Sequence, residues 1–358
     1  MERADMKTIP DLTPKESGYR FPAEWERHKA TWLSYPHSDS YSWPGTLPRI
    51  FPYYNNFIRE LSKGEQVCIN VRDEDLRKKT TLDLTAIGVD PSRLTLLIHP
   101  TNDAWCRDHG PAFLINPAAK DPRIIVSWKY NAWGEKYAHD LDEQIPRLIG
   151  SYLNIPVFYP GIVMEGGAVE FNGKGTLLTT TQCLLNNNRN PGLSQHEIED
   201  YLRNYYGIEQ VLWLDEGIEG DDTNGHIDDI TRFFKEDGVI TMIEANRSDA
   251  NHAILLENLK KLKSFRLNSG KQLDIAEVPM PVPVIYEGQR LPASYANFYI
   301  SNHAVIVPNF RCKQDDTAMR ILEECFPDRR VIGIDSIEII WGLGSFHCLS
   351  QQEPEIMV

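Results

Sequence analysis

Side chains capable of catalysis gather in four short segments of this 358-residue chain. The segments are residues 102–114 (NDAWCRDHGPAFL), 164–176 (MEGGAVEFNGKGT), 219–234 (EGDDTNGHIDDITRFF) and 342–352 (GLGSFHCLSQQ). Their patterns are neither cleanly helical nor cleanly alternating. Together they supply a thiol, a histidine, several carboxylates and closely spaced glycines, which suits nucleophilic chemistry on a bound ligand.

The cysteine in the last segment has surroundings that suit a reactive thiol. Gly342 and Gly344 precede Cys348 and let the backbone approach a ligand closely, and polar residues 350–352 follow it. A structural cysteine more usually lies inside an apolar strand. On this segment alone, a small core residue beside a turn remains the commoner interpretation of a lone cysteine.

Two other segments place carboxylates at turns. Trp105, Arg107 and Asp108 precede a Gly-Pro turn, where an aromatic face and a carboxylate can meet at a loop tip. Arg107 and Asp108 can equally form a structural ion pair. Glu165 stands directly before two glycines, which let the backbone come close to a ligand, although a solvated glutamate in an ordinary turn has the same pattern.

The remaining segment concentrates titratable groups, namely Glu219, Asp221, Asp222, His226, Asp228 and Asp229. If residues 226–234 form a strand, alternation points His226 and Asp228 to one face, where they can act together. The apolar pair Phe233 and Phe234 predicts that this strand enters the core, which disfavours a purely solvated acidic loop.

These groups suit a planar, delocalised cation. A guanidinium offers five N–H donors in a fixed fork that carboxylates accept in pairs, so Asp108 and Asp228 can bind opposite edges of it. We expect a Cys348 thiolate to attack the guanidinium carbon. His226 then serves as general acid for the departing ammonia and later as general base for water. The positive charge of the substrate helps to keep the thiolate ionised.

A metallohydrolase is the alternative chemistry, because histidine, carboxylates and cysteine can also bind a metal. The spacing is not diagnostic for it, since the sequence contains neither HExxH nor a histidine-rich cluster. The six cysteines form no CxxC pair, which predicts neither a disulfide framework nor a structural zinc site. They are Cys68, Cys106, Cys183, Cys312, Cys325 and Cys348.

The composition is that of an ordinary globular protein, with 41% hydrophobic and 25% charged residues. A formal net charge of −14 disfavours binding to nucleic acids or acidic membranes and favours small cationic partners. No window approaches the roughly 18 apolar residues of a membrane span, and the opening residues lack an apolar export signal. We therefore expect a cytoplasmic protein.

Short strands and helices must position the four segments. Apolar spacing predicts helices over residues 47–64, 137–153, 193–207, 250–265 and 315–326, with a capping box at Ser194 and Glu197 and C-caps at Gly64 and Gly207. Strands are predicted over 66–71, 94–99, 123–128, 176–181, 210–215, 238–245, 281–286, 297–301, 303–309 and 330–335.

The order of these elements predicts a repeated strand-strand-helix-strand (ββαβ) unit, because the helices recur at roughly 60-residue intervals from the second onward. A closed ring of about five units is an economical way to bury the apolar face of each. A doubly wound sheet is not expected, since no glycine-rich phosphate turn follows the first strand. No linker divides the chain, so we predict one catalytic α/β domain over residues 1–358.

With all four segments in view, the sequence resembles the agmatine deiminase and bacterial-type peptidylarginine deiminase family of guanidino-group-modifying enzymes. The motifs run nearly end to end: GYRFPAEWERHKATWLSYP, WCRDHGP, EGGAVEFNGKGTLLTT, GDDTNGHIDD, SYANFYISN and HCLSQQ. The resemblance implies a five-bladed, pseudo-symmetric α/β propeller of the pentein type, with its site in the central channel. It also implies that no metal and no organic cofactor takes part.

The resemblance implies roles for five side chains. Cys348 corresponds to the nucleophile and His226 to the acid/base catalyst. Asp108 and Asp228 correspond to the carboxylates that bind the guanidinium. Glu165 corresponds to the carboxylate that supports the histidine.

Two further residues complete the expected substrate site. Trp105 resembles the aromatic wall beside the substrate, and Gly344 allows close approach of the backbone. Two positions depart from the pattern of the agmatine branch, where Asp229 replaces an asparagine and Leu343 interrupts a run of glycines. The chemistry is therefore better supported than the substrate.

The expected reaction is hydrolysis of agmatine to N-carbamoylputrescine and ammonia, a step of putrescine and polyamine biosynthesis. Peptidyl-arginine, arginine or another alkylguanidine is the alternative substrate. A noncatalytic five-unit propeller is the alternative of a different class, although a binding protein has no need of these catalytic motifs. Glu24, Glu26 and Asp222 are candidates for the distal amine on charge alone, and a homo-oligomer stays open.

Overall fold

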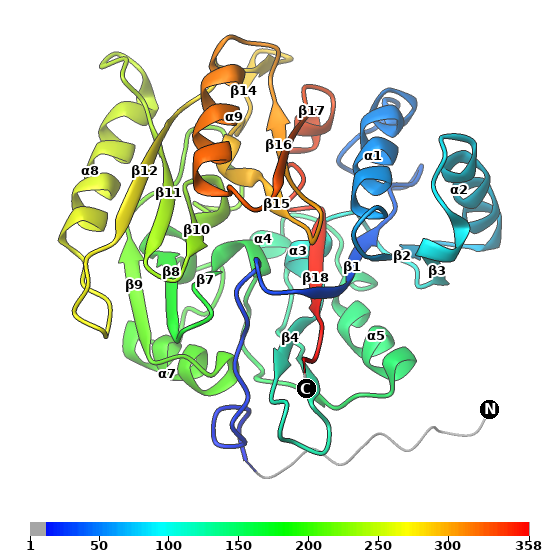
Figure 1. The fold of residues 1–358 in the computed structure, drawn as a ribbon, viewed down its shortest axis with the longest axis horizontal. Helices are drawn as coiled ribbons and strands as arrows, with labels where there is room; N and C mark the ends of the chain where they lie inside the picture. Colours follow the sequence, from blue (N-terminus) through cyan, green and yellow to red (C-terminus); the bar gives the residue numbers. More distant parts are fainter. Residues whose placement is uncertain (1–11, 358) are drawn as a thin grey trace.

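A computed structural model describes residues 12–357. Residues 1–11, which begin the stretch inspected for an export signal, and residue 358 lie outside the described part. Within it, the strands form five sheets of three or four strands and one two-stranded hairpin, with helices between them (Figure 1). No helix of the described residues is long and apolar enough to cross a membrane.

The strands group into sheets as follows. The first sheet contains β18 (Ser350–Pro354), β1 (His28–Ser34), β2 (Gln66–Val71) and β3 (Leu94–Ile98). The next three contain β4 (Ala112–Ile115), β5 (Arg123–Val126) and β6 (Val157–Phe158); β7 (Glu170–Phe171), β8 (Thr176–Thr180) and β9 (Gln210–Leu214); and β10 (Thr231–Lys235), β11 (Gly238–Ile243) and β12 (Asp274–Pro279). The last contains β15 (Tyr299–Ile300), β16 (Ala304–Asn309) and β17 (Arg330–Asp335), and the hairpin contains β13 (Ile285–Tyr286) and β14 (Gln289–Arg290).

The α-helices are α1 (Leu47–Leu61), α2 (Glu74–Ala86), α3 (Cys106–His109), α4 (Ala132–Glu135), α5 (Ile145–Leu153), α6 (Thr181–Leu184), α7 (Gln195–Tyr206), α8 (Ala250–Ser264) and α9 (Gln314–Cys325). Short 3-10 helices, including Gly166–Ala168, Ile227–Asp229 and Tyr295–Asn297, connect some of the strands.

The first sheet has a fourth strand, β3, and takes its antiparallel pair, β18 and β1, from opposite ends of the described chain. The other four larger sheets share one strand order. In each, an antiparallel pair is followed in the chain by a helix and by a strand parallel to the second member of the pair, as in β10, β11, α8 and β12. This confirms the predicted strand-strand-helix-strand unit. The first sheet joins both ends of the chain, because β18 pairs antiparallel with β1 (Figure 1).

The middle strands lie deepest. Every residue of β8 is buried, as are residues 304–308 of β16, which suits strands covered on both faces. Helices cover the sheets through apolar stripes, such as Leu255, Leu259 and Leu262 on α8. This packing holds the strand ends and their connecting turns in fixed positions, which is where the chemically capable segments lie.

Most predicted elements are present, with differences at their ends. The capping box at Ser194 and Glu197 is confirmed, and Gly207 ends α7 with φ +67°. Gly64 is not a C-cap, because α1 ends at Leu61 with Ser62 as its cap. α2 was not predicted, and the helix predicted from residue 137 starts only at residue 145.

Two strand predictions are wrong in part. Residues 226–234 do not form one strand, since Ile227–Asp229 is a 3-10 helix and β10 starts at Thr231. Residues 281–286 are a strand only at Ile285–Tyr286, because Pro281 and Pro283 have no N–H to donate to a neighbouring strand.

Candidate active site

The four segments singled out in the sequence converge at one place. The Arg107 amide donates to the Cys348 carbonyl at 3.0 Å, which joins the first segment to the last. The Gly167 amide donates to Asp108 Oδ1 at 2.9 Å, and the His347 ring lies 2.7 Å from Asp228. Turns from four different sheet connections therefore supply one site.

A pocket opens at this place and contains Cys348. Its walls combine aromatic rings, two aspartates and a glycine-rich turn: Tyr41, Ser42, Trp105, Asp108, Trp133, Tyr137, Asp222, Thr223, Trp341, Gly342, Leu343, Gly344 and Cys348. A second cavity also touches Asp108, from the side of Glu24 and Arg107, but does not reach Cys348. The pocket with the thiol is thus the one suited to covalent chemistry.

Asp108 is held from two sides. Its Oδ1 accepts from the Gly167 amide at 2.9 Å and its Oδ2 accepts from Trp133 Nε1 at 3.0 Å. A Cβ at position 167 would lie 2.6 Å from His226 Nδ1, so only glycine lets the backbone come this close. Arg107 does not pair with Asp108. It contacts Glu24 at 3.1 Å instead, so the interpretation of Arg107 and Asp108 as an ion pair is wrong.

Asp228 has one occupied and one open oxygen. Its Oδ2 lies 2.7 Å from His347 Nδ1 and 3.5 Å from Cys348 Sγ. Its Oδ1 is buried without a hydrogen-bond partner among the described residues, and lies 4.0 Å from His226 Nδ1. A buried carboxylate oxygen without a donor is costly unless a ligand supplies one.

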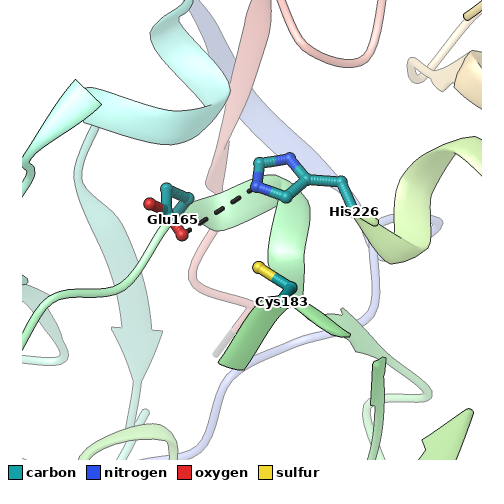
Figure 2. A group of neighbouring side chains, drawn as sticks. All are labelled: Glu165, Cys183 and His226. Atoms are coloured by element: carbon teal, nitrogen blue, oxygen red, sulfur yellow. Dashed lines mark ion pairs between the residues drawn. The ribbon is translucent and has the colours of Figure 1, made fainter. Parts of the chain in front are cut away.

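His226 lies among carboxylates. Its Nδ1 is 3.8 Å from Asp108 Oδ1, and its Nε2 is 3.9 Å from Glu165 Oε2 (Figure 2). Burial lowers the pKa of His226, but Asp108, Cys183 and Glu165 outweigh burial and hold that pKa well above its ordinary value. The ring is therefore an imidazolium at neutral pH. Although no strand aligns His226 with Asp228, the 3-10 turn still brings the two side chains together.

Glu165 is anchored by an arginine that the sequence reasoning did not single out. Arg189 Nε donates to Glu165 Oε1 at 2.6 Å, and both side chains are fully buried. Burial raises the pKa of Glu165, but Arg189 and His226 outweigh burial and lower the pKa overall. Glu165 thus stays ionised and faces the His226 imidazolium through its second oxygen.

Glu165, Cys183 and His226 are the described residues whose spacing most resembles a metal site. Their ligand atoms lie within 4.8 Å of one another (Figure 2). The donor set does not fit a cation, however. Arg189 already neutralises Glu165, and burial raises the pKa of Cys183, which keeps this thiol protonated. The group is better described as the surroundings of the His226 imidazolium.

Cys348 is buried and held by an amide. Asn297 Nδ2 lies 2.9 Å from Cys348 Sγ, and Asn297 Oδ1 accepts from the amides of His347 and Cys348. Burial raises the pKa of the Cys348 thiol well above its ordinary value, and Asp228, Asp229 and Asp108 raise it further. With the pocket empty, the thiol therefore keeps its proton.

The expected binding residues Trp105 and Gly344 both line the pocket. Trp105 Nε1 donates to Ser42 Oγ at 2.9 Å, which fixes the indole. A Cβ at Gly344 would lie 2.5 Å from the Trp105 ring, so this glycine lets the turn pack against the indole. Leu343, which interrupts the glycines, has φ +73°, a conformation that glycine adopts without strain.

Asp229, the other departure from the pattern, is fully buried beside Asn297, whose Nδ2 donates to Asp229 Oδ1 at 3.0 Å. Burial, Asp228 and Asp221 raise the pKa of Asp229 well above its ordinary value. A protonated carboxyl has a donor and an acceptor, as an asparagine amide does. The substitution is therefore conservative in hydrogen bonding at neutral pH.

Four residues of the site were not assigned roles from the sequence, namely Trp133, Arg189, Asn297 and His347. Trp133 lies in a turn of four successive residues with positive φ, from Ala132 to Glu135, whose start is fixed by Asn131 Oδ1 accepting from the Gly134 amide. Asn297 and His347 lie within the motifs SYANFYISN and HCLSQQ, which was the available signal.

The three candidates for a distal amine fall in different places. Glu24 is used by Arg107 and Arg232, and Glu26 accepts two hydrogen bonds of 2.7 Å from Arg20. Asp222 lines the same pocket as Cys348. Tyr137 OH lies 3.1 Å from Asp222 Oδ2.

Comparisons with known proteins agree on one family. Residues 20–354 match the model of the Porphyromonas-type peptidyl-arginine deiminases. A protein of Legionella pneumophila (strain Paris), named "Putative agmatine deiminase", is 36% identical over 352 residues, which cover 96% of this chain and 98% of the relative. The agmatine deiminase structure from Enterococcus faecalis has 29% identity and a TM-score of 0.89, covering 98% of this chain and 100% of that one. A substrate-bound agmatine deiminase structure from C. jejuni has 29% identity and a TM-score of 0.85, over 94% and 96%.

Proposed function

Because this chain belongs to the Porphyromonas-type peptidyl-arginine deiminase family, we propose that it hydrolyses the guanidino group of agmatine to N-carbamoylputrescine and ammonia. Relatives and similar structures named agmatine deiminases support this substrate. The observation that carries the proposal is that Asp228, whose Oδ2 lies 3.5 Å from the Cys348 sulfur, keeps a buried Oδ1 that no described residue hydrogen-bonds. A guanidinium supplies the missing donors and presents its carbon to the sulfur.

The first half of the reaction replaces a C–N bond with a C–S bond. The guanidinium binds between Asp108 and Asp228, and the Cys348 thiolate attacks its carbon. The resulting tetrahedral adduct collapses when the His226 imidazolium gives its proton to the departing nitrogen, which leaves as ammonia. A thiouronium attached to Cys348 remains.

Water completes the cycle from the same position. Neutral His226 takes one proton from the water as its oxygen attacks the thiouronium carbon. When the C–S bond breaks, the remaining hydroxyl proton passes to the sulfur, which releases the ureido product and restores the thiol. Glu165, fixed by Arg189, keeps the ring oriented and stabilises its charged form. Asn297 donates to the sulfur and so favours the thiolate in both steps.

The substrate itself assists formation of the thiolate. Burial and the carboxylates of Asp228 and Asp108 raise the pKa of Cys348 in the empty pocket. A bound guanidinium cancels part of their charge and lies next to the sulfur, so the thiol loses its proton more readily when substrate is present. The nucleophile is thereby activated mainly in the presence of a cationic substrate.

The outer part of the pocket favours agmatine over arginine. Asp222 lies on the pocket wall with the aromatic rings of Tyr137 and Trp341, which suit an ammonium at the end of an alkyl chain. The α-carboxylate of free arginine would bring a second negative charge toward Asp222. A small cationic guanidine is therefore the proposed partner.

Several wider features belong to the same proposal. The four sheets of like strand order, together with the fifth sheet in which β18 pairs with β1, support a single catalytic domain closed as a five-bladed propeller over residues 1–358. Six free cysteines support a reducing, cytoplasmic location. The catalytic cycle above uses no metal and no organic cofactor, and a homo-oligomer is compatible with it.

The test is a substrate panel with ammonia release and ureido product as readouts. Agmatine, arginine, a peptidyl-arginine and an alkylguanidine without a terminal amine are compared, each with and without iodoacetamide and EDTA. We expect agmatine to have the highest kcat/KM, with activity lost to the alkylator and kept in EDTA. Preference for peptidyl-arginine would replace the substrate assignment, and zinc-restored activity after EDTA would replace the mechanism.

A further inference from the structure

A buried histidine next to the nucleophile bridges two carboxylates. His347 is 1% exposed, with Nδ1 2.7 Å from Asp228 Oδ2 and Nε2 2.9 Å from Glu24 Oε2. No step of the proposed reaction uses this ring directly. Its position immediately before Cys348 nevertheless couples it to the site through Asp228.

The two contacts determine how many protons the bridge holds. Glu24 is ionised, because Arg107 and Arg232 each lie 3.1 Å from one of its oxygens. A neutral imidazole has one N–H, so it can donate to one carboxylate but turns a bare nitrogen toward the other. A neutral ring therefore binds Asp228 through an Nδ1–H, and Glu24 then takes its donors from Arg107 and Arg232.

Burial, Arg107 and Arg232 lower the pKa of His347, so the neutral ring offers its N–H to Asp228 Oδ2, the oxygen nearest the nucleophile. Asp228 Oδ2 is 3.5 Å from Cys348 Sγ, where a full negative charge disfavours a thiolate. Asp228 Oδ1 accepts no hydrogen bond from the described residues and lies 4.0 Å from His226 Nδ1. Because the His347 ring binds Asp228 Oδ2, it reduces the negative charge beside the Cys348 sulfur and leaves Asp228 Oδ1 for the substrate.

We propose that His347 is a positioning residue that acts through Asp228, orienting this carboxylate for the guanidinium and limiting its repulsion of the Cys348 thiolate. The orienting part rests on the proposed guanidine hydrolysis. The acidity of the thiol does not, because it can be measured without substrate. The charged groups that face the ring are Glu24, Asp228, Arg107 and Arg232.

The test measures the pH dependence of Cys348 alkylation by iodoacetamide, read by mass spectrometry, in the wild type, His347→Gln and His347→Leu. Glutamine keeps an amide donor for Asp228 but lacks the ring nitrogen that reaches Glu24, and leucine keeps only volume. We expect the alkylation midpoint to rise by about one pH unit in the leucine variant and by less in the glutamine variant. We expect kcat/KM for agmatine to fall roughly a hundredfold in the leucine variant and roughly tenfold in the glutamine variant. KM should rise more in the leucine variant.

A matched control is His37→Gln, because His37 is also a buried histidine but its Nε2 binds the Thr101 carbonyl, at 2.9 Å. This variant loses thermal stability and keeps the wild-type alkylation midpoint. An unchanged midpoint in folded His347 variants, or loss of folding in both, means that His347 is only structural. If the alkylation midpoint rises in the His347 variants but the wild type does not hydrolyse agmatine, the effect of His347 on the Cys348 thiol is supported and the proposed function is refuted.

Discussion

Two groups of buried acidic side chains lie on either side of His347. They differ in the source of the positive charge that binds them, which is the chain's own arginines in one group and the proposed substrate in the other. The arginine-paired cluster consists of Glu24, Arg107, Glu170 and Arg232. The pocket carboxylates, named for their effect on the thiol in the pocket, are Asp108, which lines the pocket, and the buried Asp228 and Asp229. In the first group the chain's own guanidinium groups bind the carboxylates, whereas no arginine among the described residues forms an ion pair with any of the three in the second.

This difference indicates a structural role for the arginine-paired cluster and a substrate-binding role for the pocket carboxylates. Arg232 Nε donates to Glu170 at 2.8 Å and Nη1 donates to the carbonyls of Ala296 and Phe298, while Nη2 lies 3.1 Å from Glu24 without a hydrogen bond among the described residues. Asp228 instead keeps an oxygen without a donor. The arginine-paired cluster thus contains the same guanidinium–carboxylate pairing that we propose for the substrate and the pocket carboxylates.

The largest expected effect is at the nucleophile. Cys348→Ser should abolish turnover and leave the fold intact, because a hydroxyl is a far weaker nucleophile at neutral pH and the change in volume is small. Mass spectrometry should trap a covalent adduct on the wild type alone. If the serine variant keeps more than about a hundredth of the wild-type rate, Cys348 does not form the C–S bond.

Asp228→Asn tests the pocket carboxylates directly. The new amide turns an N–H donor toward the guanidinium, which itself offers only donors. The fall in kcat/KM should correspond to a loss of about 3 to 5 kcal/mol of transition-state stabilisation. The melting temperature should barely change, since Oδ1 has no partner to lose.

Asp108→Asn should lose a similar amount of activity. It should be somewhat less stable, because Gly167 and Trp133 donate to both oxygens of Asp108 and an amide accepts from only one. Near-normal kinetics with a large drop in melting temperature, in either aspartate variant, would instead make the carboxylates structural.

Arg232→Met should show the opposite pattern. Removing a fully buried guanidinium leaves Glu170 without its cation and Glu24 with Arg107 alone, which costs on the order of 3 kcal/mol of unfolding free energy. Denaturant unfolding measures this loss. Arg20→Met is the control, because its pair with Glu26 is partly exposed and contributes about 1 kcal/mol or less. Equal losses in the two variants would remove the distinction between the clusters.

The sequence predicted the reacting groups better than their supports. Cys348, His226 and the carboxylates stand in segments whose residue types already point to chemistry, and they meet as predicted. Asn297 and Trp133 act through an amide and an indole N–H, which occur throughout any chain and indicate nothing until the fold brings them to Cys348 and Asp108.

The fold shows the same division. Apolar periodicity predicted the repeated unit, but β18 was missed because SQQEP reads as a polar loop. This strand is buried because its polar groups find distant partners, as when Arg107 donates to Gln352 and Trp32 donates to Glu353. Such pairings join residues far apart in the chain, and local patterns do not contain them.

Asp229→Asn should have the smallest effect on activity, although Asp229 neighbours Asp228. Because the pKa of Asp229 is raised well above its ordinary value, the wild-type side chain is protonated at neutral pH and an amide reproduces its hydrogen bond from Asn297. We expect kcat/KM at pH 7 to stay within a few-fold of the wild type. At alkaline pH the variant should keep activity longer, since ionised Asp229 raises the pKa of Cys348.

Stability should follow the same titration. In the unfolded chain Asp229 ionises near pH 4, whereas in the folded protein it keeps its proton, so this group reduces the unfolding free energy progressively as pH rises from about 4 toward its folded pKa. The asparagine variant lacks this loss, and its melting temperature should gain on the wild type over that range. A variant as inactive as Asp228→Asn, with no pH-dependent gain in melting temperature, would mean that Asp229 is ionised and belongs among the groups that bind the cation.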